Sequence, residues 1–196
     1  MNPTPLWVIF VGSLFTNNIL LASLLGMCSF LVCSSRIDTA LGLSYAVIFV
    51  TTCTTAINYL IYYHVLVPLH LDYLAFVVFI AMIAAFVQFV EMFVERFSPK
   101  LYHSLGIFLP LITVNCAILG AVLFMVIRKY DFVQSVTFGV SSGMGWGLAI
   151  LLMAGLRDKM GYSNVPAPLR GLGVLMMVTG VIAMVFMGFA GMLNMQ

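Results

Sequence analysis

Charge is what this sequence has least of. Of its 196 residues, 8 are Lys or Arg and 6 are Asp or Glu, which makes 7% of the chain, against about a quarter in soluble domains. So few charges cannot solvate the surface of a protein of this size, and a water-soluble monomer is excluded. With a mean hydropathy of +1.16, the chain is predicted to be an integral membrane protein. Its net charge of +2 is too small to indicate a nucleic-acid partner.

Catalytic and modular signatures are also missing. The sequence has no P-loop, nucleophile elbow, His-Glu-x-x-His pair or nucleotide-binding domain, so energy must come from partner subunits or an ion gradient. It has no linker rich in Gly and Ser and no polar tail of domain size, which predicts one transmembrane domain over 1–196. No Lys or Arg precedes the first apolar run, so we do not expect a cleavable signal peptide.

Six apolar stretches reach the length of about 20 residues that a helix needs to cross about 30 Å of hydrocarbon. Charged or turn residues separate the stretches, and any other fold would leave backbone amides unpaired in lipid. The sequence therefore predicts an all-α bundle of six transmembrane helices, at roughly 6–32, 40–63, 73–95, 104–127, 132–156 and 170–193.

The Lys and Arg residues predict the orientation, because they accumulate on cytoplasmic loops. If the N-terminus lies outside, two cations lie outside, Arg128 and Lys129. Six then lie inside: Arg36, Arg96, Lys100, Arg157, Lys159 and Arg170. This asymmetry predicts that both termini lie on the periplasmic face of a bacterial inner membrane.

Six helices also allow an internal repeat of three, with halves at roughly 1–97 and 98–196. Halves with an odd number of helices are inverted relative to each other, and such repeats commonly place broken helices and a binding site near mid-membrane. The sequence similarity between the halves is short and covers Ser44–Val47 and Thr137–Val140. The residues alone therefore leave the repeat open.

Two of the hydrophobic stretches look interrupted by polar or helix-breaking residues. The first contains Asn17, Asn18, Gly26, Met27 and Cys28, and the fourth contains Gly106, Pro110, Thr113, Asn115 and Cys116. A proline removes an amide donor, and asparagine side chains can bind the backbone groups that a break releases. Ordinary interhelical hydrogen bonds with a proline kink are the alternative interpretation of each stretch alone. A cysteine after both interruptions favours a function.

The chain has four cysteines. No Cys-x-x-Cys or close Cys/His spacing exists, so neither a self-contained zinc or ferredoxin-type site nor a disulfide framework is expected. Cys33 and Cys53 have ordinary apolar and Thr neighbours, typical of packing. On straight helices, Cys28 and Cys116 would be about 14 Å apart along the membrane normal. They can share a site only if the first stretch is broken or re-entrant.

Gln88, Glu91 and Glu95 lie on one face of the third predicted helix. Glu95, beside Arg96, is interpreted as an interfacial charge. Glu91 lies one turn deeper, where a carboxylate is costly. An ion pathway and a structural hydrogen bond both remain open for it.

Glycine recurs at every fourth position of the fifth predicted helix, at Gly139, Gly143 and Gly147. The bare stripe predicts close helix packing, within the chain or against another subunit. The run 143–147 lacks the strand-turn-helix context of a dinucleotide fingerprint.

Several segments resemble the small six-helix subunits shared by the sodium-pumping NADH:quinone reductase and the Rnf ferredoxin:NAD complex. They are Gly26–Cys28, Gln88–Met92, the long run Leu105–Cys116 and Val165–Gly171, and the resemblance covers nearly the whole chain. Within this family, Gly143–Gly147 and Leu156–Met160 are more similar to the E subunits of the sodium-pumping reductase than to their Rnf counterparts. The chain lacks the Ser-Gly-Ala-Thr-type flavin attachment motif of the B and C subunits.

The resemblance implies an inverted three-plus-three repeat whose first and fourth helices are broken into half-helices. It implies that Cys28 and Cys116 each give a thiolate to an iron site shared with the D subunit, best described as an intramembrane [2Fe–2S] cluster. The helix breaks around it would involve Asn17, Asn18, Gly26, Pro110, Thr113 and Asn115. Cys33 and Cys53 match no ligand position.

The implied activity is electron transfer from NADH to ubiquinone coupled to Na⁺ export, in a complex with the A, B, C, D and F subunits. Glu91 is then a candidate for the Na⁺ pathway. Three alternatives stay open: the A subunit of an Rnf complex, a secondary transporter that would be active as an isolated chain, and a purely structural assembly subunit.

Overall fold

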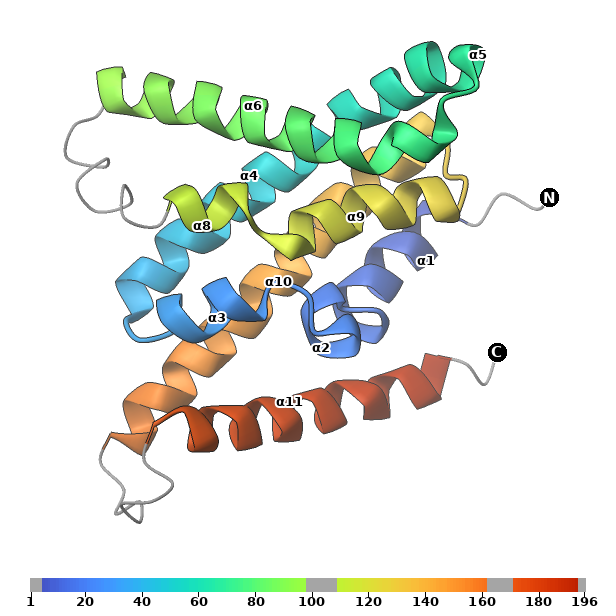
Figure 1. The fold of residues 1–196 in the computed structure, drawn as a ribbon. Coiled ribbons are helices and arrows are strands. Elements are labelled where there is room, and N and C mark those ends of the chain that lie inside the picture. The colour runs from blue at the N-terminus through green and yellow to red at the C-terminus, as the bar shows by residue number, and fades with distance from the viewer. Residues whose placement is uncertain (1–4, 98–108, 162–170, 194–196) are drawn as a thin grey trace.

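A computed structural model describes residues 5–97, 109–161 and 171–193. These residues form helices joined by turns, with no β-strand among them (Figure 1). The elements in chain order are α1 (Leu6–Val11), the π-helix η1 (Gly12–Thr16), α2 (Ile19–Ser23), α3 (Met27–Cys33), α4 (Ile37–Ile61), the π-helix η2 (Tyr62–Leu66), α5 (Val67–Leu69), the 3-10 helix η3 (Asp72–Leu74), α6 (Ala75–Phe97), α8 (Leu109–Thr113), α9 (Cys116–Ile127), α10 (Phe132–Met160) and α11 (Leu172–Leu193).

Four helical segments among the described residues are long and apolar enough to cross a membrane: Ile37–Leu69, Ala75–Phe93, Pro110–Ile127 and Phe132–Met160. They match the second to fifth predicted stretches, and α11, of 22 residues, matches the sixth. The first stretch is divided among α1, η1, α2 and α3. The all-α membrane fold is confirmed. That six helices cross the membrane stays a prediction. Gly106 lies outside the described residues, as do parts of the resembling segments Leu105–Cys116 and Val165–Gly171.

The two longest helices, α4 and α10, pack against each other through the centre of the molecule (Figure 1). The glycine stripe forms their seam. A Cβ added at Gly143 would lie 2.9 Å from the Cα of Ile48, and one at Gly147 would lie 3.2 Å from the Cβ of Ser44. The stripe therefore lets the two helices approach closely, as predicted, within this chain.

Helix α4 is rich in Thr and Ser, whose hydroxyls are costly in lipid unless they are paired. Ser44, Thr51 and Thr55 each donate to the backbone carbonyl four residues earlier, at 2.6–2.7 Å. These bonds satisfy the hydroxyls within the helix itself, so α4 can place polar side chains at the bundle centre and stay helical.

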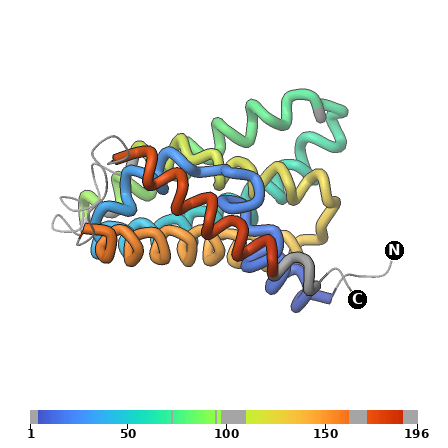
Figure 2. The backbone as a smooth tube through the Cα atoms, turned by 90° about the horizontal axis from the view of Figure 1, so that it is seen from below, coloured from blue at the N-terminus to red at the C-terminus, as the bar shows by residue number. Residues whose placement is uncertain are grey.

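The turns gather at two opposite ends of the bundle. The ends of α3, α6 and α10 lie at one end, and the turn from α9 to α10 lies at the other (Figures 1 and 2). Arg36, Arg96 and Arg157 therefore lie opposite Arg128 and Lys129, as the charge pattern predicts. The start of α1 and the end of α11 share the latter end (Figure 1).

Candidate metal site at two broken helices

The first break follows η1, where the chain leaves helical geometry at Asn17 and Asn18. Asn18 caps α2, because its side-chain oxygen accepts a hydrogen bond from the amide of Leu20 at 3.0 Å. Its side-chain nitrogen donates to the carbonyls of Gly145, at 2.8 Å, and Leu14, at 3.3 Å. Asn18 is buried and Asn17 is exposed. Of the two predicted asparagines, Asn18 is thus the one that holds the break against α10.

A left-handed link joins α2 to α3. Leu24 has a φ of 55° and Gly26 a φ of 84°, a region that favours glycine. A Cβ at position 26 would lie 2.6 Å from Nε1 of Trp146 and 2.9 Å from Oδ1 of Asn115. Both the backbone angle and the space around position 26 therefore require glycine.

The second break lies between α8 and α9. Asn115 has an extended backbone, with φ −76° and ψ 110°, and its Oδ1 caps α9 by accepting from the amide of Ala117 at 3.0 Å. Cys116 is the first residue of α9. Pro110 lies near the start of α8, and the chain leaves helical geometry only after Thr113. The break therefore lies at the asparagine cap, a turn beyond the proline.

The two breaks share a sequence motif. Asn18 and Asn115 each bind the amide two residues later, and each follows a threonine by two positions, Thr16 and Thr113. Each asparagine also lies the same number of residues after the start of its predicted half. The Thr-x-Asn motif is therefore a sequence signal that the two breaks are equivalent. The short similarity between Ser44–Val47 and Thr137–Val140 gives no such signal, because neither segment lies at a break.

The starts of α3 and α9 meet at a sulfur atom. The backbone amide of Gly26 donates a hydrogen bond to Sγ of Cys116 at 2.9 Å. Cys28 is the second residue of α3, two positions beyond Gly26, and its side chain is exposed. The break thus removes the separation expected for straight helices and brings together the beginnings of two half-helices that each carry a cysteine.

The described residues contain no group of three or more His, Cys, Asp or Glu side chains placed to hold a metal ion. Cys28 and Cys116 alone therefore cannot complete a four-ligand site within the described parts of the chain. The exposure of Cys28 leaves it open to a second chain. Cys33 ends α3 in the apolar core, and Cys53 is half-buried on α4, so neither lies at a break.

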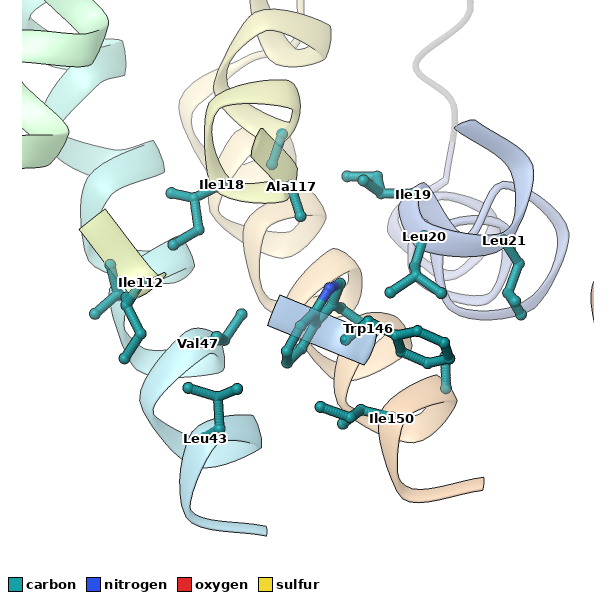
Figure 3. Packing of buried hydrophobic residues seen from close by; sticks show 14 of the residues in the cluster. Ile19, Leu20, Leu21, Leu43, Val47, Ile112, Ala117, Ile118, Trp146 and Ile150 are labelled. Carbon is teal, nitrogen blue, oxygen red and sulfur yellow. The ribbon is translucent and has the colours of Figure 1, made fainter. Parts of the chain in front are cut away.

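Two buried donors beside these breaks have no acceptor among the described residues, Nε1 of Trp146 and Nδ2 of Asn115. Trp146 is 1% exposed and Asn115 is 2% exposed. Figure 3 shows the indole between Val47 of α4 and Leu20 of α2, with its nitrogen on the edge nearer Ala117. An unpaired buried donor costs about 1–3 kcal/mol. Nothing in the sequence around Trp146 indicates this position, which depends on a contact between distant segments.

Arg157 fixes the far end of α3. Its Nη1 donates to the carbonyl of Leu31 and to Oγ of Ser34, both at 2.9 Å. A cation is favourable at the last carbonyls of a helix. From hydropathy the fifth stretch ends at 156 and Arg157 counts only as a loop charge, but α10 continues to Met160.

A cavity of about 290 Å³ opens beside Cys116, lined by Thr113 and Asn115 of the break and by residues of α6 as far as Ala84. Glu91 is half-buried on α6 about two turns beyond Ala84. The structure therefore does not bring Glu91 into the cavity beside the cysteine.

Comparison with known proteins agrees with this architecture. A family model described as "Rnf-Nqr subunit, membrane protein" matches residues 6–193. Three relatives are named as the E subunit of the Na(+)-translocating NADH-quinone reductase. The protein of Psychrobacter sp. (strain PRwf-1) is 49% identical, with 94% of this chain and 96% of the relative aligned. Those of Psychromonas ingrahamii and Aeromonas hydrophila are 50% and 51% identical, each with 93% of this chain and 96% of the relative aligned. The chain therefore belongs to the Rnf-Nqr family of membrane subunits, which confirms the resemblance seen in its sequence.

Proposed function

We propose that this chain is the E subunit of a Na⁺-translocating NADH:quinone reductase, and that Cys28 and Cys116 hold an iron–sulfur centre together with two thiolates of the D subunit. The observation that carries the proposal is the 2.9 Å bond from the amide of Gly26 to Sγ of Cys116, because it unites the starts of α3 and α9. The names and identities of the relatives support the choice of this subunit.

The donor set fits such a centre. Thiolates are the usual ligands of iron–sulfur clusters, and N–H groups around the sulfur atoms tune them. One amide, that of Gly26, already binds the sulfur of Cys116. Two buried donors nearby, on Trp146 and Asn115, have no acceptor in the described chain. Only two cysteines lie at the breaks and one is exposed, which suits a [2Fe–2S] centre shared between two subunits.

When bound, the centre supplies a one-electron carrier within the low-dielectric layer of the membrane. The residues of this chain hold it there: Asn18 and Asn115 cap the half-helices at the breaks, and Arg157 fixes the end of α3. A centre held there would let electrons from NADH on the cytoplasmic side cross the inner membrane. The Lys and Arg asymmetry supports a periplasmic location for both termini.

The decisive experiment replaces each cysteine in turn within the purified complex. Cys28→Ala and Cys116→Ala are expected to lose iron and its paramagnetic resonance signal, because each removes one of the two ligands given by this chain. Cys33→Ala and Cys53→Ala are the matched controls and retain both. Iron and electron transfer that survive both ligand changes would make this chain an assembly subunit. Na⁺ uptake by the isolated chain would indicate a secondary transporter instead.

We also propose Glu91 for the Na⁺ pathway. If the centre is held at the breaks, a change in its charge would be costly in low dielectric, and the half-helices of this chain and an ion path would respond to it. Glu91→Gln keeps the size of the side chain and removes its charge. The expected result is less Na⁺ transported per electron in proteoliposomes, with the exposed Glu95→Gln as control. An unchanged ratio removes Glu91 from the pathway.

A further inference from the structure

Trp146 occupies an unusual place for a tryptophan of the α4–α10 core. It is 1% exposed, and its indole N–H has no acceptor among the described residues. A phenylalanine would fill an apolar site without leaving a donor unpaired. The indole nitrogen instead lies 2.6 Å from the Cβ position of Gly26, the residue whose amide binds Sγ of Cys116.

Asn115 repeats this arrangement from the other break. Its Oδ1 is engaged by the cap on Ala117 and lies 2.9 Å from the same Cβ position of Gly26. Its Nδ2 is left without an acceptor in the described chain. Three donor-bearing residues therefore meet at one short link, Gly26, Trp146 and Asn115. Within the described chain, only the amide of Gly26 among these three donors has an acceptor, and that acceptor is a sulfur atom.

We propose that the indole N–H of Trp146 and the side-chain amide of Asn115 donate hydrogen bonds to sulfur atoms of the centre, and thereby raise its midpoint potential. The inference rests on the proposed function. Its physical basis is that reduction adds negative charge to the sulfur atoms, so N–H donors stabilise the reduced form more than the oxidised form. Trp146 and Asn115 are positioning residues here, and neither is a ligand.

The test measures the midpoint potential in the purified complex by redox titration followed by electron paramagnetic resonance. Trp146→Phe removes the N–H and replaces the indole with a smaller ring. A tryptophan analogue with sulfur in place of the indole nitrogen, β-(3-benzothienyl)alanine, removes the N–H and keeps the shape. Asn115→Ser removes Nδ2 and keeps a capping oxygen. Trp7→Phe is the matched control, because Trp7 is the other tryptophan of the chain and is 75% exposed on α1.

Loss of one donor is expected to change the reduced-to-oxidised ratio about tenfold at fixed potential, a downward shift of about 59 mV for one electron, with iron retained. The Trp7 variant keeps the original potential. Unchanged potentials in the analogue and in Asn115→Ser, with iron present, overturn this inference and leave the proposed function standing. If Trp146→Phe loses iron, the midpoint potential of the complex with the isosteric analogue tests the inference in its place. An unmodified complex without iron overturns the proposed function itself.

Discussion

Replacing Gly26 with alanine tests whether the two breaks must meet. The added methyl would lie 2.6 Å from Nε1 of Trp146, 2.9 Å from Oδ1 of Asn115 and 3.0 Å from the Cβ of Ala117. None of these atoms belongs to a flexible exposed side chain, since all three residues are buried and Asn115 is fixed by its cap on α9. The methyl therefore displaces the start of α3 or the start of α9.

Two terms set the size of the effect. A left-handed backbone costs an L-residue about 1–2 kcal/mol, and overpacking a filled site costs about 1–3 kcal/mol. Gly26→Ala is thus expected to destabilise the fold by about 2–5 kcal/mol and to break the bond from position 26 to Cys116. Because Cys28 follows Gly26 by two residues, iron retention should fall together with stability.

The assay is the melting temperature and iron content of the purified complex, with two control variants that separate the terms. Gly171→Ala has a positive φ of 122° but no atom of the described residues within 4 Å, so it tests backbone strain without a clash against them. Gly155→Ala has open space in a helix, where alanine stabilises by up to about 1 kcal/mol. A Gly26→Ala complex with unaltered melting temperature and iron would refute the claim that the breaks close around this glycine.

Two further changes probe how the half-helices are held. Asn18→Ala removes a cap and leaves the carbonyl of Gly145 without its 2.8 Å bond, so we expect a loss of about 2–4 kcal/mol in thermal stability. The exposed Asn17→Ala should change stability by less than about 0.5 kcal/mol, and equal losses would contradict the assignment. Arg157→Gln removes both 2.9 Å bonds to the end of α3 and should lower iron retention, whereas the exposed Lys159→Gln, which removes a cation from the same helix end, should not. Equal iron contents in these two variants would contradict a specific role for the two Arg157 bonds.

Hydropathy and glycine spacing predicted the helices and the α4–α10 seam because both depend on the chemistry of consecutive turns. The break positions were also visible, since Asn18 and Asn115 interrupt apolar runs. The residues that hold the half-helices in place could not be identified from the sequence. Trp146 and Arg157 act across more than a hundred residues of sequence, and only the folded arrangement of α10 against α2 and α3 shows what they contact. Helix ends were misplaced for a related reason: α10 continues through Arg157 to Met160, because charged residues at the membrane surface remain helical.

The departures from local rules gather where the two breaks meet. Leu24 takes a left-handed φ of 55° between two half-helices, a conformation that costs a side-chain-bearing residue about 1 kcal/mol or more. Among the described residues, five buried polar side-chain atoms lack a partner, and three of them belong to Thr16, Asn115 and Trp146. The same bundle pairs the hydroxyls of Thr51 and Thr55 at 2.6 Å, so it is capable of satisfying polar groups. A fold selected only for the stability of the isolated chain would have removed these costs. Two of the unpaired donors, on Trp146 and Asn115, belong to residues beside Gly26, whose amide binds Cys116. Their position is explained if the acceptors arrive with a sulfur-rich centre, which would make assembly with the partner chain part of what stabilises this protein.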